Sequence, residues 1–578
     1  MSPPQTSVPP TPAPIPAPIA NAGAGALAPI GFGRLFAVAV PHLAALSLLL
    51  ETETEFGARL CFILSWGCLN FFWLTLLRRP ALSGAMSLTI VVILVLLSRL
   101  KHDIVQMTVN FVDLMMIDRD SIAFFFTIYP NLRWSSVIAA LLILPLMIAL
   151  WRLDPFRVKR LPAAAASLAC LAMLTAFSLM WPQEDWRGYY DDNYVSKFTR
   201  SGAVAVSDFL NYGFMESAPV SSDRLKLPLE DSCHPAARRP HIIMIHDESS
   251  YDIRSAPQIK LPPGYGSHFV SSDGKARKFL AESNGGSSWL TEYNVLTGLS
   301  SRSFGRFSYF VTRIAANRVE RGLPLALKRC GYSTLSLYPA YGSFMGERSF
   351  QATAGIEKFY DAKDLGAKGL EPDGFFYDNA VKLLSQEKPG TPVFMYVYLG
   401  ANHFPWASPL RPERTPGWTN PGNDPVIDEY LRRQTMSVQD YGAFVAKLKK
   451  QFPNEPFLIV RYGDHQPEFS TNIIEPNLTE DDVAKRLMAY DPRYFATYYT
   501  IDTVNFKPAA TDTAMETIDA AYLPLVVQDA AGLPLDPSFE EQKKIMLRCK
   551  GLFYSCKDGA EARRFNRMLI DAGFIKNL

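Results

Sequence analysis

Hydrophobic residues are concentrated in the first third of the chain, where they form five long blocks. Each block is close to the roughly 20 residues that a helix needs to cross the hydrocarbon core of a bilayer. The blocks cover residues 31–50, 58–77, 81–99, 136–152 and 162–181. Their number and length exceed what the core of a soluble domain uses. The pattern therefore predicts a membrane domain with five transmembrane helices within residues 31–182.

Charges in the connecting loops predict the orientation of these helices. The first loop, ETETEFG, is acidic, whereas the second carries Arg78 and Arg79 and the fourth is the basic segment WRLDPFRVKR. Because basic loops stay in the cytoplasm, we expect the N-terminus inside and everything after residue 182 outside. The third loop, residues 100–135, also falls outside. Its segment DIVQMTVNFVDLMMI predicts an amphipathic helix along the membrane surface, with a simple connector as the alternative.

The rest of the chain divides into segments that differ in composition and in the pattern of apolar residues. Residues 1–30 are rich in Pro and Ala and are predicted to be disordered. Residues 183–234 form a predicted linker. Within residues 235–578, short apolar runs alternate with helical patterns: the predicted strands are HIIMIHD, YSTLSLYPA, PVFMYVYLGA and PFLIVRYGD, and the predicted helices include DGFFYDNAVKLLSQ and SVQDYGAFVAKLKKQF. This alternation predicts an α/β domain with a mostly parallel sheet and helices on both faces.

Charge and cysteine content restrict the possible partners and indicate where disulfides can form. Lys and Arg total 58 and Asp and Glu total 56, a balance that argues against nucleic acid as a partner. Four of the seven cysteines lie in the predicted outer part, where disulfides can form. Cys549 and Cys556 frame a short loop that a disulfide could close, and pairing of Cys233 with Cys330 would complete an even set. Spacing alone leaves both pairings open.

Polar residues follow three of the predicted strands. In parallel sheets, ligands bind beyond the carboxyl ends of the strands, so these residues are expected to share one edge. They are Asp247, Glu248, Asn402, His403, Asp464 and His465. Each pair alone is more often a loop feature or a packing residue. Their convergence predicts a site for one divalent metal, because carboxylate and imidazole ligands suit zinc or manganese.

A candidate nucleophile lies between the first and second strands. In the segment ESNGGSSWLTEYNVLTG, two glycines precede Ser287 and Ser288, and an apolar helical pattern follows. A serine at a helix N-terminus is well placed to meet a phosphate, and the alternative is that it only caps the helix. Metal coordination would activate the hydroxyl and neutralise charge on a transferring phosphoryl group.

These motifs resemble the membrane-anchored branch of the alkaline phosphatase–sulfatase superfamily. That branch contains lipoteichoic acid synthases, phosphoglycerol transferases and, more distantly, phosphoethanolamine transferases. The resemblance implies an extracytoplasmic sulfatase-like domain. It assigns the nucleophile to Ser288, four residues before Glu292-Tyr293, and the metal ligands to Glu248, Ser288, Asp464 and His465. His403 in NHFP matches a substrate-side and catalytic histidine, and Arg348 in GERSF matches an arginine that contacts the head group.

The family also implies a reaction. A phospholipid head group, glycerol phosphate in the first instance, passes through a phospho-serine to a hydroxyl of an envelope glycan or glycolipid, and diacylglycerol remains in the bilayer. The implied cofactor is one divalent metal, manganese or zinc, with magnesium as a further candidate. The implied location is the bacterial inner membrane with the catalytic domain in the periplasm.

Three positions depart from the family pattern. Ser288 stands where Thr is usual, Gly346 where an aromatic residue is usual, and Tyr338 where His is frequent. The alternatives of phosphoethanolamine as the head group, water as the acceptor and Ser287 as the nucleophile therefore stay open. A degenerate member that binds lipid without turnover is a further alternative.

Overall fold

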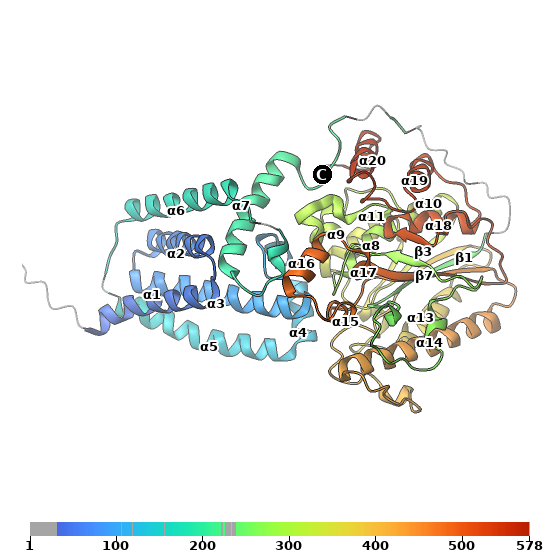
Figure 1. Ribbon diagram of the computed structural model, residues 1–578, viewed down its shortest axis with the longest axis horizontal. Helices are drawn as coiled ribbons and strands as arrows, with labels where there is room; N and C mark the ends of the chain where they lie inside the picture. Colours follow the sequence, from blue (N-terminus) through green and yellow to red (C-terminus); the bar gives the residue numbers. More distant parts are fainter. Residues whose placement is uncertain are drawn as a thin grey trace, which may run out of the picture.

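The computed structural model describes residues 32–105, 107–117, 119–154, 156–183, 185–220, 223–225, 233, 239–576 and 578. The predicted disordered segment 1–30 lies outside these residues. An elongated group of helices forms one end of the molecule, and an α/β part forms the other (Figure 1). The two predicted units of the chain are thus visibly separate in the fold.

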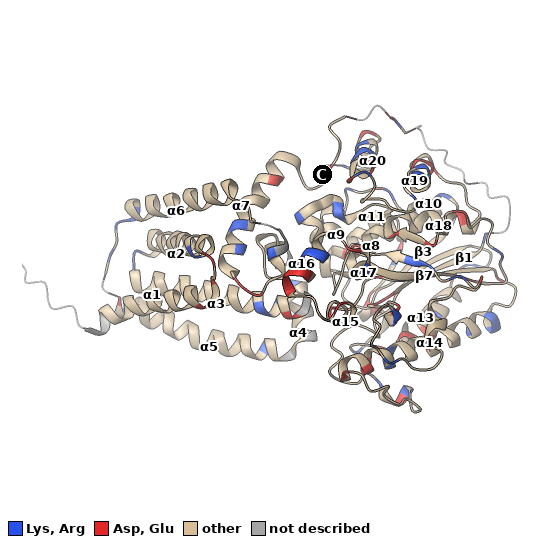
Figure 2. Ribbon diagram, in the orientation of Figure 1, with Lys and Arg blue, Asp and Glu red and all other residues tan. Residues whose placement is uncertain are grey.

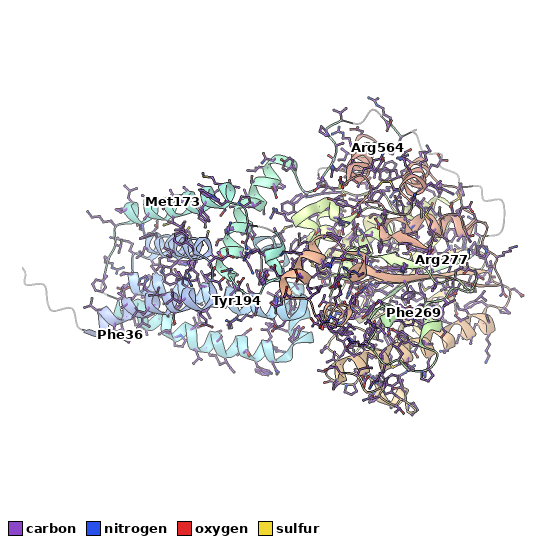
Figure 3. All side chains as sticks on the ribbon, in the orientation of Figure 1. Phe36, Met173, Tyr194, Phe269, Arg277 and Arg564 are labelled. Carbon is purple, nitrogen blue, oxygen red and sulfur yellow. A yellow bond between two sulfur atoms is a disulfide. The ribbon has the colours of Figure 1, made fainter. Side chains whose placement is uncertain are left out.

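Five helices are long and apolar enough to cross a membrane, which confirms the prediction. They are α1 Phe32–Thr52, α2 Phe56–Leu77, α3 Pro80–Val105, α5 Pro130–Leu153 and α6 Arg160–Met180. Many of their apolar side chains face outward: Phe36 on α1 is 60% exposed and Met173 on α6 is 52% exposed (Figure 3). Exposed apolar surface on this scale is typical of helices whose solvent is lipid.

The loops lie as the charge pattern predicted. The segments between α2 and α3 and between α5 and α6, which carry the basic residues, lie at the end of the helices away from the α/β part (Figures 1 and 2). The amide of Val158 donates a 3.0 Å hydrogen bond to the carbonyl of Arg78, so the two basic loops meet. The α/β part thus lies at the opposite end of the helices from the basic loops.

The prediction of one amphipathic helix over DIVQMTVNFVDLMMI was wrong. The third membrane helix continues to Val105, and a short 3-10 helix, η1 Phe111–Met116, starts anew after it. Asn110 explains the break: its side chain accepts hydrogen bonds from the amides of Val112 and Asp113, and the Asp113 carboxylate accepts one from the amide of Asn110. This reciprocal capping fixes a helix start at Asn110. A separate helix, α4 Arg119–Ile128, follows.

The α/β part is built on one eight-stranded sheet in the order β4-β3-β5-β1-β6-β7-β2-β8. The first five strands in that order pair in parallel, and β7 runs antiparallel to both of its neighbours. This arrangement confirms the predicted mostly parallel sheet. The strands are β1 His241–Asp247, β2 Lys278–Leu280, β3 Ser333–Leu337, β4 Lys358–Tyr360, β5 Val393–Tyr398, β6 Phe457–Gly463, β7 Ala496–Val504 and β8 Thr517–Asp519.

Helices cover both faces of the sheet (Figure 1). One face packs against α8 Ser288–Thr297, α9 Val311–Ala315, α10 Leu323–Arg329, α11 Glu347–Ala354, α18 Leu523–Ala531, α19 Pro537–Arg548 and α20 Ala560–Asp571. The other packs against α13 Asp373–Leu384 and α14 Pro425–Gln451. Burial of apolar residues on both faces explains why the inner strands read as nearly continuous hydrophobic runs.

Shorter helices complete the chain. They are α7 Tyr194–Tyr212, α12 Ala362–Leu365, α15 Ser470–Ile474, α16 Glu480–Met488 and α17 Pro492–Phe495, with 3-10 helices η2 Asp185–Tyr189, η3 Ile253–Ser255, η4 Tyr265–Phe269, η5 Ser301–Phe310, η6 Phe344–Gly346, η7 Pro412–Arg414 and η8 Ala520–Tyr522. The α7 helix lies within the predicted linker and packs on α2 and α6. The connection between the two parts therefore includes a helix of 19 residues that packs on the membrane helices.

The two parts contact each other directly. The hydroxyl of Tyr309 on η5 donates to the sulfur of Met107 at 2.8 Å, and Arg313 on α9 contacts the hydroxyl of Ser121 on α4 at 3.4 Å. The side chain of Tyr190, the residue after η2, also hydrogen-bonds Asp481 on α16. The α/β part is thus held against one end of the membrane helices.

Both cysteine pairs considered from the sequence form disulfides. Cys233 joins Cys330 across 97 residues, and Cys549 joins Cys556 across 7 residues. The first bond ties the segment before β1 to the end of α10. The second closes a loop between α19 and α20.

Removal of the long-range disulfide is expected to destabilise the protein more than removal of the short one. A longer closed loop restricts the unfolded chain more, so separations of 97 and 7 residues give losses of about 4–5 and about 2–3 kcal/mol. Thermal unfolding of the Cys233→Ala/Cys330→Ala and Cys549→Ala/Cys556→Ala proteins in one detergent measures the order. Equal losses in the two proteins would contradict this explanation.

Candidate active site at the carboxyl edge of the sheet

Three adjacent parallel strands bring the candidate residues together. In the central strand β1, His246 is opposite Tyr398 of β5 and Tyr462 of β6, and Asp247 is opposite Gly463. The loops that follow these strands therefore begin side by side. This register places Glu248 next to the segment that carries Asp464 and His465, as the strand-end argument predicted.

Three buried side chains form a group that could hold a metal ion. One ligand atom from each of His246, Glu248 and Asp464 lies within 4.8 Å of the others. The Nε2 atom of His246 and the Oδ2 atom of Asp464 are 3.1 Å apart, yet neither makes a well-oriented hydrogen bond among the described residues. Buried polar atoms normally have partners, so two orphaned ligand atoms in one group fit a divalent cation.

Ser288 and His465 lie against this group. The hydroxyl of Ser288 donates to Glu248 Oε2 at 3.2 Å and is 3.2 Å from His465 Nε2. The same nitrogen is 3.4 Å from Glu248 Oε1 and 3.3 Å from Asp464 Oδ2. The other ring nitrogen of His465 contacts the carbonyl of Gln466 at 2.8 Å, which aims Nε2 at the site. The structure thus brings the four predicted metal ligands together.

The pKa values of the site reflect this crowding. Burial would raise the pKa of Glu248, but the hydrogen bond with His465 and the charges of His403, His465 and His246 lower it below its usual range. Burial would lower the pKa of His465, but the charge of Asp464 and the contact with Glu248 raise it to about 9. The carboxylate is therefore ready to bind a cation, whereas the imidazole must first lose a proton.

The turn before the nucleophile is shaped by its backbone. Gly285 has φ 72° and Ser287 has φ 61°, and α8 begins at Ser288. The amide of Gly285 donates to the carbonyl of Gln466 at 2.8 Å, which anchors the turn beside the metal group. Ser287 occupies the cap position, but its side chain caps no helix amide. The simple capping role considered for these serines is therefore not what holds the helix start.

His246 is the site residue that sequence reasoning missed. Its Nδ1 atom is 2.8 Å from the hydroxyl of Tyr396 and 2.9 Å from that of Tyr462, and its ring stacks on Tyr398 at 3.8 Å. The hydroxyl of Tyr398 in turn donates to Glu248 at 3.3 Å. These tyrosines leave Nε2 facing the metal group. The available signal was its position near the carboxyl end of β1, just before Asp247 and Glu248, where ligands bind in parallel sheets.

His403 is held close to the site by a buried arginine. Its ring stacks on Phe404 at 4.3 Å, and Nδ1 is 2.7 Å from the carbonyl of Phe404. Arg433, which is 1% exposed, donates to the carbonyls of Ala401, His403, Pro405 and Ser408 at 2.8–3.3 Å. Glu429 holds the guanidinium at 2.7 Å. One side chain on α14 thus fixes the whole loop that carries His403.

Arg348 is engaged away from the metal group. Its guanidinium pairs with Asp361 at 2.8 Å and Asp364 at 3.3 Å and covers the ring of Phe359 at 4.7 Å. About half of the side chain is exposed. The neighbouring residue Glu347, by contrast, is fully buried. The head-group role of Arg348 stays a prediction.

Comparison with known proteins gives one family match, which lies in the α/β part. Residues 281–516 match the protein-family model described as Sulfatase. A lipoteichoic acid synthase from Staphylococcus saprophyticus is 25% identical over 159 residues, which cover 26% of this chain. They cover 24% of the relative, so the match spans about a quarter of that curated protein.

Two solved structures are similar in fold. A phosphoglycerol transferase from Streptococcus pyogenes, solved with sn-glycerol-1-phosphate, is 18% identical with a TM-score of 0.43, covering 58% of this chain and 86% of its own. A lipooligosaccharide phosphoethanolamine transferase from Neisseria meningitidis, an integral membrane protein, is 12% identical with a TM-score of 0.44, covering 87% and 95%. At these identities the likeness concerns the fold alone.

Replacement of His246 is expected to weaken metal binding. His246→Ala removes a ligand atom from the buried group, so the affinity for Mn²⁺ or Zn²⁺ should fall by at least about tenfold, the effect of losing even an outer partner of a ligand. Calorimetric titration of the metal-free protein measures this. His241→Ala, at the opposite end of the same strand, is the matched control. Unchanged affinity in His246→Ala would exclude it as a ligand.

Metal binding is also expected to release a proton. At neutral pH the His465 imidazole is protonated because its pKa is about 9, and it binds a cation only when neutral. Affinity should therefore rise by about tenfold per pH unit across the neutral range and level off near pH 9. Titration in two buffers with different ionisation enthalpies counts the protons released. A pH-independent affinity without proton release would contradict the role of His465.

Proposed function

We propose that the protein, whose residues 281–516 match the family model described as Sulfatase, transfers a phospholipid head group to an envelope glycan or glycolipid through a phosphorylated Ser288. One observation carries the proposal: the Ser288 hydroxyl lies 3.2 Å from both Glu248 and His465, directly beside the buried His246–Glu248–Asp464 group. A serine hydroxyl is a poor nucleophile unless a neighbouring base or cation activates it. This site is equipped to supply that activation.

In the first step, Ser288 Oγ attacks the phosphorus of the donor lipid. The Oγ–P bond forms as the bond from phosphorus to the diacylglycerol oxygen breaks. Ser288 gives up its proton to solvent, because Glu248, with its lowered pKa, is a poor base, and His403 supplies a proton to the leaving diacylglycerol oxygen. A divalent cation, manganese, zinc or magnesium, would be held by Glu248, Asp464, His246 and His465 and would neutralise the charge that develops on the phosphoryl group.

In the second step, an acceptor hydroxyl attacks the phosphorus and the Oγ–P bond breaks. His403, which gave up a proton in the first step, accepts the proton of that hydroxyl, and Ser288 takes a proton back from solvent. The clamp of Arg433 on the His403 loop keeps this base in place through both steps. With water as the acceptor the same chemistry gives a phosphodiesterase, which is the alternative outcome.

The nature of the head group follows from the family relation. The NHFP and TEYNVLTG motifs and the similarity to a lipoteichoic acid synthase both favour glycerol phosphate. Phosphoethanolamine is the alternative head group. Arg348 would contact the head group after exchanging Asp361 or Asp364 for a substrate oxygen.

The membrane part gives the reaction its location. The α/β part rests on the end of the helices away from the basic loops, which supports a location on the periplasmic side of the inner membrane. Contacts such as Tyr309 to Met107 keep the catalytic edge of the sheet near the bilayer. A donor lipid then meets Ser288 without leaving the membrane, which raises its effective concentration.

Two adjacent serine variants test the proposal. With Mn²⁺ and phosphatidylglycerol vesicles, Ser288→Ala should lose diacylglycerol release by about 1000-fold or more, because it removes the attacking atom. Ser287→Ala is the matched control and should keep most of the activity, because its side chain makes no cap contact. Equal activity of the parent and Ser288→Ala would exclude the proposed nucleophile.

The acceptor is tested in the same assay. Diacylglycerol release that depends on added envelope glycan, with the head group recovered on the glycan, is the expected result for a transferase. Release at the same rate without glycan, with free head-group phosphate as product, would assign the site to hydrolysis instead.

A further inference from the structure

Two buried carboxylates lie behind the nucleophile. Glu292 is on α8, one helical turn after Ser288, and Glu347 is the first residue of α11. Both side chains are fully buried, with 0% exposure. Gln351, one helical turn after Glu347 on α11, hydrogen-bonds Glu292 and so brings the two carboxyl groups to the same place. Two adjacent buried carboxylates are costly unless something neutralises them.

The protein supplies almost no donor to this pair. Neither oxygen of Glu347 has a hydrogen-bond partner among the described residues, and neither does Glu292 Oε2. The nearby hydroxyl of Thr312 is committed to the carbonyl of Met345 at 2.8 Å. Only Glu292 Oε1 receives a hydrogen bond, from the side-chain amide of Gln351. Three carboxylate oxygens are therefore left as buried acceptors.

The side-chain amide of Gln351 contributes a further buried oxygen without a hydrogen-bond partner. Gln351 is fully buried on α11, and its nitrogen donates to Glu292, which places the whole amide group at the pair. Its carbonyl oxygen Oε1 has no partner among the residues that the structure describes. A fourth acceptor oxygen thus belongs to the same cluster. A group in which four acceptor oxygens have no partner, and Gln351 Nε2 is the donor, calls for a cation rather than for another acceptor.

A third buried carboxylate, Glu282, shows how donors of the chain itself can satisfy such a group. Glu282 is also buried, and its oxygens accept hydrogen bonds from the Asn294 side chain at 2.8 Å and from the amide and hydroxyl of Ser301 at 2.7 Å. The carboxylate of Glu282 is thus satisfied by hydrogen-bond donors from the protein itself. Glu347 and Glu292 Oε2 lack the donors that Glu282 has.

We propose that Glu292, Glu347 and Gln351 hold a second divalent cation of the magnesium, manganese or calcium class. Two carboxylates carry a charge of −2, which one divalent ion balances. The available atoms are all oxygens, which suits hard cations and differs from the imidazole-containing group at His246. This site goes beyond the proposed reaction, since it lies outside the residues that contact Ser288.

The pKa values agree with a pair that needs a positive charge. Burial raises the pKa of Glu292, and burial together with the charge of Glu292 raises that of Glu347 well above its usual range. Protons are thus the alternative to a metal ion. A bound ion would also tie α8 to α11 one turn from Ser288 and so stiffen the helix that begins with the nucleophile.

Counting bound ions tests the proposal. Equilibrium dialysis of the full-length protein in detergent against Mn²⁺ should give two ions per chain for the parent. Glu347→Gln should lose one ion and keep the one at the His246–Glu248–Asp464 group, whereas Glu248→Ala should lose that ion and keep the second. Glu282→Gln is the matched buried control and should retain both ions.

The outcomes separate this site from the proposed reaction. One ion per chain in the parent, or two ions retained by Glu347→Gln, would overturn the second site and assign the pair to shared protons or the ion to another place. Two ions in a protein that releases no diacylglycerol would leave the second site standing and refute the reaction. If Glu347→Gln does not fold, Gln351→Met takes its place and is expected to weaken the second ion alone.

Discussion

The parallel pairing of β1 with β5 and β6 is the constraint on which the site depends. In this register His246 lies between Tyr398 and Tyr462, and the three strands end together. The chain must then leave the sheet in adjacent loops, which carry Glu248, His403 and Asp464. A shift of one residue in β1 would turn His246 away from Asp464 and bury an apolar side chain in its place. The hydrophobic runs that hold the register therefore also hold the chemistry.

Burial makes the charged groups at this edge of the sheet costly unless other charges or hydrogen bonds compensate them. His246, Glu248, Asp464 and His465 are all buried, and the tyrosines around His246 satisfy only one of its nitrogens. A divalent cation compensates such a group better than hydrogen bonds do, because the remaining free atoms converge on one point. The Glu292–Glu347 pair repeats the problem one turn further along α8. Charge compensation thus links the stability of this region to its function.

Much of the architecture could be predicted from the sequence because its signals are local. Apolar length gave the membrane helices, and alternating apolar runs and helical patterns gave the parallel sheet. The capping of η1 by Asn110 and Asp113 was also encoded locally, but the continuous apolar pattern around it concealed the break. A two-residue capping signal competes poorly with a fifteen-residue periodicity when the segment is read as a whole.

The site was only partly predictable, for physical reasons. Glu248, Ser288, Asp464 and His465 follow strands or a glycine turn, where position alone suggests exposure at the sheet edge. His246 lies inside a strand, so its apolar neighbours suggested a packing role. The contrast between exposed Arg348 and buried Glu347 depends on how α11 packs, which no local pattern fixes.

The most direct test of the account is the intact mass of the protein after brief incubation with Mn²⁺ and phosphatidylglycerol vesicles, quenched in acid and compared with Ser288→Ala. The account predicts added mass equal to one glycerophosphoryl group in the parent alone, located on Ser288 by peptide mapping. Added mass of a phosphoethanolamine group from phosphatidylethanolamine vesicles instead would keep the mechanism and change the head group. Absence of both an adduct and diacylglycerol with either lipid would contradict the central claim.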